Sequence, residues 1–380
     1  MAWENKFFGD CAELIRDTVQ PGEALGLPYI GLEHISQGKL SLLGFGKSDD
    51  VISAKSRFRK GDILFGKLRP YFRKVIIAPF DGVCSTDIWV VRAKQGTDQK
   101  YLYYWMASEE FVETSSRASE GTKMPRAQWE FVEKIQQDLP YEPEQRATAG
   151  ILGALDDKIE LNRRMNQTLE SMARAVFREM MKEEQWKETT IGEIVTVVGG
   201  STPSTANPAF WEGGNINWAT PKDLAPLQSP ILLDTNSRIT ELGLREISSG
   251  LLPAGTVLLS SRAPIGYLAI PQIPVAINQG FIAIKCTEEA PNYFILNWLK
   301  DNMEEIIGRA NGTTFLEISK SNFRPMSIVV PPPKRMKEFV KTVEPMYQKI
   351  VANLKESRIL ASLRDALLPK LMRGEVRVKL

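Results

Sequence analysis

Residues 152–180 read LGALDDKIELNRRMNQTLESMARAVFREM, and this stretch decides how the chain is organised. Its inward-facing candidates recur at alternating steps of three and four residues, the heptad pattern of a helix that packs along another helix. The pattern returns 191 positions later with every position keeping its polar or apolar character, except that Arg364 replaces Ala173. We expect two long helices packed along a seam of Leu152, Leu155, Ile159, Asn162, Asn166, Leu169, Val343, Met346, Ile350, Asn353, Ser357 and Leu360.

The repeat extends into the segments that precede each helix. Short matches occur in the same order in both halves of the chain, and their offset drifts from 194 to 191, as small loop deletions would produce. The matched pairs are Lys60–Leu64 with Ala254–Leu258, Pro70 with Pro264, Gly121-Thr122 with Gly312-Thr313, and Leu139-Pro140 with Val330-Pro331.

Each half therefore has the same plan, a globular part followed by a long helix. Pro140 and Pro143 precede or open the first helix, expected at about Glu144–Glu184, and Pro331–Pro333 announce the second, at about Lys334–Arg373. We predict an α+β fold with two similar mixed-sheet domains, 1–142 and 186–333, and two helical repeats, 143–185 and 334–380, that pair antiparallel around an internal pseudo-two-fold axis. Expected strands are Asp62–Phe65, Lys74–Ala78, Ile88–Arg92, Val257–Ser260 and Phe281–Lys285. The alternative is that each helix packs only on its own domain.

Two similar modules held apart by paired helices suit a ligand with two separated sites. Duplex DNA has that form, because dyads relate its two strands. A seam of about 30 residues spans roughly 45 Å, which corresponds to on the order of 13 base pairs. The pattern therefore predicts a reader of a split DNA target.

Longer motifs resemble a known family. Residues 154–166, ALDDKIELNRRMN, and 169–174 resemble the central repeat of the specificity subunit of type I restriction–modification systems, and Leu363–Leu371 resembles the C-terminal repeat of that subunit. Residues 199–204, GGSTPS, together with Ser261–Gly266 and Ile277–Gly280, resemble its target-recognition domains. The first globular part departs from this pattern because it lacks the GGSTPS opening.

The resemblance implies a non-catalytic specificity subunit that reads a bipartite target in double-stranded DNA. Its helices would bind two methyltransferase subunits, and motor-nuclease subunits would join in the full restriction endonuclease and adenine-specific methyltransferase complex. No cofactor would bind this chain directly, since the partners would hold S-adenosylmethionine, ATP and magnesium.

Candidate DNA contacts are donors and cations near the predicted turns, because base edges and phosphates offer mostly acceptors. The alternative for Arg262 is an ion pair with a local carboxylate, and for Asn278 and Gln279 it is a turn cap. In the first module the candidates are Lys67, Arg69, Arg73, Lys74, Lys123 and Arg126, and in the second Ser261, Arg262, Tyr267, Asn278, Gln279 and Lys320.

Composition excludes several other kinds of site. Three cysteines are too few and too scattered for a disulfide framework or a zinc site, and the single histidine, His34, makes a histidine-based triad or a histidine-rich metal site hard to build. We therefore predict no catalytic residues and no metal site, and we expect Asp156, Asp157 and Glu160 to form a solvated helix face. Apolar runs are too short to span a membrane, and Met1–Thr18 lacks a signal-peptide core, so a cytoplasmic protein is expected.

Two other classes of function remain open at this point. A coiled-coil adaptor that never contacts DNA would explain the duplicated helices equally well. It explains the dense basic segment Lys55–Lys74 poorly. An enzyme with its own methyltransferase or nuclease activity is disfavoured, because residues 207–210, NPAF, lack the accompanying Gly-rich cofactor loop.

Overall fold

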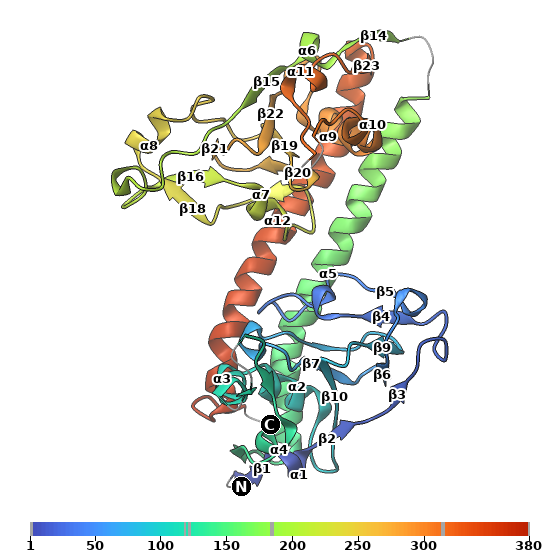
Figure 1. Cartoon of the computed structure of the whole chain (residues 1–380), viewed down its shortest axis with the longest axis vertical. Coiled ribbons are helices and arrows are strands. Elements are labelled where there is room, and N and C mark those ends of the chain that lie inside the picture. The colour runs from blue at the N-terminus through green and yellow to red at the C-terminus, as the bar shows by residue number, and fades with distance from the viewer. Residues whose placement is uncertain (1–2, 118, 121–122, 183–185, 313–315, 379–380) are drawn as a thin grey trace. The chain divides into compact units, whose positions relative to one another are not determined.

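The computed structural model describes residues 3–117, 119–120, 123–182, 186–312 and 316–378 (Figure 1). The expectations for Gly121, Thr122, Thr313 and Glu184 fall outside these residues. The chain divides into two compact units. Unit 1 comprises residues 1–160 and 356–380, and unit 2 comprises residues 161–355, so each unit includes a globular module and a part of both long helices.

Unit 1 contains two main sheets. The first is antiparallel, in the order β2 (Ala12–Ile15), β10 (Ile88–Ala93), β7 (Ile63–Gly66), β8 (Val75–Ile77). The second has the order β3 (Thr18–Val19), β6 (Lys55–Phe58), β9 (Gly82–Cys84), β4 (Pro28–Ile30), β5 (Gly46–Lys47), and its β4–β9 pair is parallel. Two short pairs complete the strands, β1 (Glu4–Phe7) with β13 (Gln136–Leu139) and β11 (Ser119–Glu120) with β12 (Arg126–Ala127).

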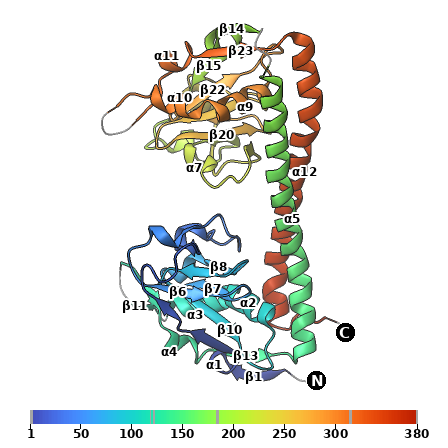
Figure 2. The same cartoon turned by 90° about the vertical axis from the view of Figure 1, so that its right-hand side faces the viewer.

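Helices cover the first sheet of unit 1 (Figure 2). Residues of α2 pack with β7 and β10 in one core, and since every residue from Tyr101 to Ala107 is buried, this helix is enclosed on all sides. Asp98 caps α2 by accepting from the Tyr101 N–H. The helices are α1 (Phe8–Cys11), α2 (Gln99–Ala107), α3 (Glu109–Arg117) and α4 (Trp129–Val132).

Unit 2 has the corresponding elements. Its larger sheet has the order β15 (Thr196–Gly199), β22 (Phe281–Lys285), β19 (Val257–Ser261), β20 (Ile265–Pro271), β17 (Ile231–Leu232), and its smaller sheet has the order β18 (Ser237–Ile239), β16 (Ile216–Ala219), β21 (Ala276–Ile277). β14 (Lys187–Thr190) pairs with β23 (Ser327–Val330). The helices are α6 (Ile191–Ile194), α7 (Pro221–Leu224), α8 (Glu241–Arg245), α9 (Asn292–Asp301), α10 (Met303–Gly308) and α11 (Lys320–Phe323).

The two units repeat one strand plan. The antiparallel order β2-β10-β7-β8 of unit 1 recurs as β15-β22-β19-β20 in unit 2. The parallel pair β4–β9 likewise recurs as β16–β21. The predicted α+β class with two similar mixed-sheet modules is therefore confirmed, and the five expected strands lie within two residues of β7, β8, β10, β19 and β22.

The long helices are α5 (Glu142–Met180) and α12 (Pro333–Met372). Pro143 and Pro333 fall in the first turns, where a missing N–H costs no helical hydrogen bond. After α12, Gly374 takes the left-handed conformation (φ 69°) that terminates many helices.

Inside each unit the two helix segments run antiparallel. In unit 1, Lys158 and Asp156 of α5 contact Glu356 and Arg364 of α12, respectively. In unit 2, Asn166 and Phe177 of α5 contact Asn353 and Phe339 of α12, respectively. In both units, contacts farther along α5 are made with residues nearer the start of α12, as antiparallel packing requires. Among the described residues, no helix is long and apolar enough to cross a membrane.

Candidate nucleic-acid interface

Three distant segments of unit 2 meet where β19 ends. The Ser261 N–H donates to the Gly280 carbonyl (2.8 Å), just before β22. The Ser261 carbonyl accepts from the Ile318 N–H (3.0 Å), just before α11. We call this place the β19 edge and define it as residues 199–204, 261–264, 277–280 and 317–320.

The GGSTPS segment packs against the β19 edge by close backbone approach. A Cβ atom on Gly200 would lie 1.9 Å from the Ile277 carbonyl oxygen, so only glycine fits there. The next N–H, of Ser201, donates to that same carbonyl (3.2 Å). The Thr202 hydroxyl then reaches the Gln279 side-chain oxygen. The motif therefore shapes the edge.

Some candidate side chains of unit 2 are exposed, and others contact neighbouring residues. Lys320 and Gln279 are exposed, and the Lys320 ammonium lies 3.1 Å from where a Gly199 Cβ would be. Arg262 Nη1 lies 3.5 Å from Glu317 Oε2, and Asn278 Oδ1 accepts from the Gly280 N–H (2.9 Å).

Two further candidates of unit 2 are more buried. The Ser261 hydroxyl is buried without a hydrogen-bond partner, and Tyr267 is half-buried in β20. Their contact with DNA stays a prediction, as it does for Arg262 and Asn278.

Unit 1 has the same framework where β7 ends. The Lys67 N–H donates to the Asp87 carbonyl (2.9 Å), and the Ala127 N–H donates to the Lys67 carbonyl (2.9 Å). These two bonds repeat those of Ser261 with Gly280 and Ile318. We call residues 67–69, 87 and 123–127 the β7 edge.

An arginine–carboxylate pair occupies the β7 edge. Arg126 Nε and Nη2 donate to the two carboxylate oxygens of Asp87, at 2.8 and 3.2 Å. Asp87 therefore raises the pKa of the Arg126 guanidinium. Arg69, held in the left-handed conformation (φ 51°), donates through Nη2 to the carbonyl of exposed Lys123 (3.3 Å).

Two other candidates of unit 1 have partners away from that edge. Arg73 Nη2 lies 3.7 Å from Asp365 Oδ1 of α12, and burial lowers the pKa of this guanidinium. The Lys74 ammonium donates to the Leu32 carbonyl, and burial lowers its pKa as well. Both cations are engaged with other residues of unit 1, so any role in binding DNA stays a prediction.

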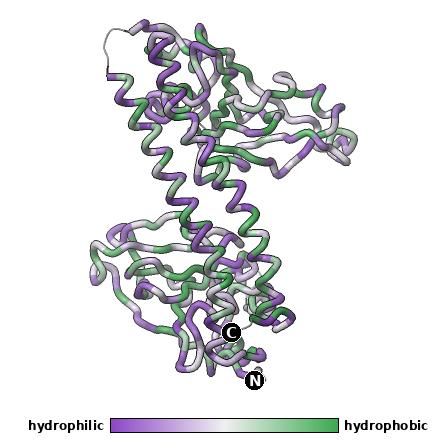
Figure 3. The backbone as a smooth tube through the Cα atoms, turned by 180° about the vertical axis from the view of Figure 1, so that it is seen from behind, coloured by the Kyte–Doolittle hydropathy of each residue, from purple (hydrophilic) through white to green (hydrophobic). Residues whose placement is uncertain are grey.

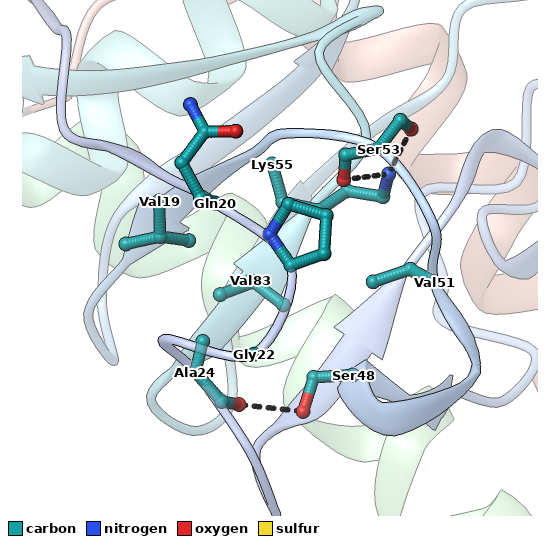
Figure 4. A pocket seen from close by; sticks show the side chains of 10 residues that line it. Val19, Gln20, Gly22, Ala24, Ser48, Val51, Ser53, Lys55 and Val83 are labelled. Atoms are coloured by element: carbon teal, nitrogen blue, oxygen red, sulfur yellow. Dashed lines mark hydrogen bonds between the residues drawn. The ribbon is translucent and has the colours of Figure 1, made fainter.

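The basic segment 55–74 does not form one surface. Lys55 is only 7% exposed and donates to the Ser53 carbonyl (2.8 Å) and hydroxyl (2.7 Å) (Figure 4). The adjoining cavity, about 10 Å³, is lined by Val19 and Val83 among others and has room for about one water molecule. Arg59 is exposed but precedes β7, at the end of the strand opposite to Lys67.

Hydrophobic and hydrophilic stretches alternate along both long helices, as Figure 3 shows along the tube. The seam positions are all buried or half-buried. Leu152 shares a core with module residues of unit 1, and Val343 and Ile350 share one with those of unit 2. The helices therefore pack on each other and on the modules at once, so the two arrangements that the sequence left as alternatives coexist.

Polar seam residues meet inside unit 2. The Asn353 side-chain amide donates to Asn166 Oδ1 (2.9 Å), and the Asn162 amide donates to the Asn353 carbonyl (3.4 Å). These hydrogen bonds favour one register of the two helices, because a shifted register would leave buried amides unpaired.

Sequence reasoning missed the carboxylates of both edges and one in the helix pair. Asp87 and Glu317 were not considered, because acidic residues are not sought in a DNA interface. The repeat carried a signal, since the offset of 191 aligns Arg126 with Glu317. Asp156 was expected on a solvated face, and that expectation is wrong. It accepts from Arg364 Nη1 and from the Tyr104 hydroxyl, both at 2.7 Å.

Comparison with known proteins decides the family. Residues 2–171 and 183–359 match the family described as type I restriction modification DNA specificity domain, one match for each half of the repeat. The chain belongs to this family. It is a type I restriction–modification specificity subunit, and its relatives are specificity subunits rather than catalytic ones.

The relatives cover most of this specificity subunit. It is similar to the type I restriction enzyme MjaIX specificity subunit of Methanocaldococcus jannaschii, with 25% identity over 85% of this chain and 79% of the relative. The HindI specificity subunit of Haemophilus influenzae is 22% identical, over 85% and 88% of the two chains. The crystal structure of the S subunit from M. genitalium shares the fold, with a TM-score of 0.58, 17% identity and coverage of 97% and 96%.

Proposed function

We propose that this specificity subunit reads a bipartite target in double-stranded DNA, with the β7 edge contacting one half-site and the β19 edge the other. The observation that carries the proposal is the shared backbone framework, in which Lys67 and Ser261 make the same two hydrogen bonds in their own units. A duplicated frame with different side chains suits two half-sites of different sequence.

The side chains on this frame suit the chemistry of DNA. Lys67, Lys123 and Lys320 supply cations for phosphates, which hold register without reading sequence. Arg126, Arg262 and Gln279 offer forked or paired donors, which can distinguish base edges in the major groove. Unit 1 therefore depends more on cations, and unit 2 more on amides and hydroxyls.

Recruitment of two methyltransferase subunits by the helices is the second part of the proposal. Met172 of α5 and Leu363 of α12 are 191 positions apart and are 47% and 46% exposed. Equivalent apolar residues on the two helix repeats suit two copies of one partner. S-adenosylmethionine, ATP and magnesium would then be held by the methyltransferase and motor-nuclease partners.

The decisive experiment maps methylated adenines across the genome of cells with and without this chain. We expect a split motif that disappears when the chain is deleted and returns when it is supplied again. Methylation that persists unchanged without the chain contradicts the proposal. The variants Met172→Glu and Leu363→Glu should each reduce co-purification of the methyltransferase, whereas Arg59→Ala, on a module surface, should not.

Binding strength should depend on the partners. The net charge is only +2, so the isolated chain offers little long-range attraction for a polyanion. We expect weak, strongly salt-dependent binding by the isolated chain and tight specific binding by the complex with methyltransferase. Nanomolar specific binding by the chain alone at physiological salt would contradict this expectation.

A further inference from the structure

Both edges hold an arginine–carboxylate pair, and one member of each pair occupies the same position of the repeat. In unit 1, Leu68 forms an isolated β-bridge with Arg126, and in unit 2, Arg262 forms one with Glu317. The offsets of 194 and 191 align Leu68 with Arg262 and Arg126 with Glu317. The arginine therefore lies on one of the two bridged segments in unit 1 and on the other in unit 2. Both units nevertheless have a guanidinium beside a carboxylate.

A carboxylate is unexpected at an edge proposed to face DNA, because its negative charge repels the phosphates. Asp87 has both carboxylate oxygens on Arg126, and its side chain is 25% exposed. This carboxylate therefore adds no unpaired negative charge to the edge. Asp87 holds the planar guanidinium of Arg126 in a fixed orientation, as bidentate pairs do.

Among the residues that the structure describes, a second pair of N–H donors on Arg126 has no partner. A guanidinium carries five N–H donors, and the bond to Asp87 takes the Nε–H and one Nη2–H. The remaining Nη2–H and one Nη1–H are parallel and point away from the carboxylate. The Arg126 side chain is 43% exposed, so this end can meet a ligand.

We propose that Arg126, oriented by Asp87, reads a guanine in the half-site contacted by unit 1. Guanine presents O6 and N7 side by side in the major groove, and a parallel pair of N–H donors matches them. Asp87 is then a positioning residue that acts through Arg126. This inference rests on the proposed function, because it assumes that the β7 edge meets DNA.

The pair in unit 2 is looser. Arg262 Nη1 and Glu317 Oε2 lie 3.5 Å apart, farther than the two bonds between Arg126 and Asp87, and the two side chains are 38% and 44% exposed. A guanidinium without a bidentate hydrogen-bonded partner keeps more rotational freedom. Arg262 should therefore discriminate its base less sharply than Arg126 does.

The test is the methylated motif made by the complex of full-length chain and methyltransferase. Arg126→Ala should make one guanine position of one half-site degenerate, with a loss of discrimination of about tenfold or more. Arg126→Lys should not restore it, because an ammonium lacks the planar fork. Asp87→Asn should weaken discrimination at the same position, and the other half-site should stay unchanged throughout.

The matched control is Arg59→Ala, which removes an exposed arginine at the opposite end of β7 and should leave both half-sites unchanged. An unaltered motif with uniformly slower methylation in Arg126→Ala would overturn the inference, because it would mark a phosphate contact. Loss of recognition at both half-sites in Arg126→Ala would also overturn the inference. If the wild-type complex makes no split motif, the proposed function fails instead, and the two failures are thereby distinguished.

Discussion

Arg364 of α12 donates through Nη1 to Asp156 Oδ1 of α5 at 2.7 Å, and its side chain is 3% exposed. This pair explains the one break in the repeated heptad pattern. The equivalent positions in unit 2 are Ala173 and Tyr347, which are both fully buried in the hydrophobic core, and the Tyr347 hydroxyl accepts from the Asn297 amide (3.3 Å). Unit 1 thus uses a buried ion pair where unit 2 uses hydrophobic packing.

Replacing Arg364 should destabilise unit 1 strongly. Among the described residues, Arg364→Ala leaves the Asp156 carboxylate with the Tyr104 hydroxyl as its one hydrogen-bond donor, and breaking a buried pair in this way costs about 3–5 kcal/mol. Urea unfolding gives the free energy. The matched control is Arg146→Ala, an exposed pair with Glu142 on α5, expected to cost less than about 1 kcal/mol. Equal costs for the two variants would contradict the assigned role.

Stability should fall in acid through Glu144. Arg377 donates to both Glu144 oxygens (2.8 and 2.7 Å), and this bond lowers the pKa of Glu144 below its ordinary value of 4.5. Because the pKa of Glu144 is lower in the folded state, its ionised form stabilises the fold at pH values above 4.5. That stabilisation is lost as the pH falls through the pKa of the folded state. Arg377→Ala should therefore be less stable than wild type at neutral pH, and the difference in stability should close as the pH falls below 4.5 and through the folded value. Unfolding measured across this range tests it, and a gap independent of pH refutes it.

The buried asparagines of unit 2 should be coupled. Asn166→Leu leaves the Asn353 amide without its acceptor, which costs about 1–3 kcal/mol. Asn353→Leu should cost a similar amount, and the double variant should cost less than the sum because no amide is then left unpaired. A double-mutant cycle from urea unfolding measures the coupling. Strictly additive costs would mean that this hydrogen bond contributes nothing.

Gly200→Ala should disturb the β19 edge. The added Cβ would meet the Ile277 carbonyl at 1.9 Å, so the backbone of one segment must move. We expect a lower melting temperature and loss of one half-site from the methylated motif. Gly308→Ala is the control in the same unit, since a Cβ there meets nothing within 4 Å and alanine favours the helix. An unaffected motif in Gly200→Ala would show that this contact does not shape the interface.

The sequence was sufficient for the duplicated plan, the α+β class and the long helices. Heptad spacing and proline positions are local signals, because a helix seam depends on residues a few positions apart. Repetition is likewise visible in one dimension, so β7 and β19 could be aligned before any contact was known. The family motif GGSTPS marked the β19 edge through a glycine that sterics require.

Tertiary structure alone decided which polar groups remain exposed. Arg73 meets Asp365, Arg126 meets Asp87 and Asp156 meets Arg364, and each partner lies far along the chain. Composition cannot distinguish a paired cation from an exposed one, because pairing depends on which distant segments the sheet edges and helices bring within a few ångströms of each other. The same limit applied to Lys55, whose burial follows from the packing of its strand and the adjacent loops around it.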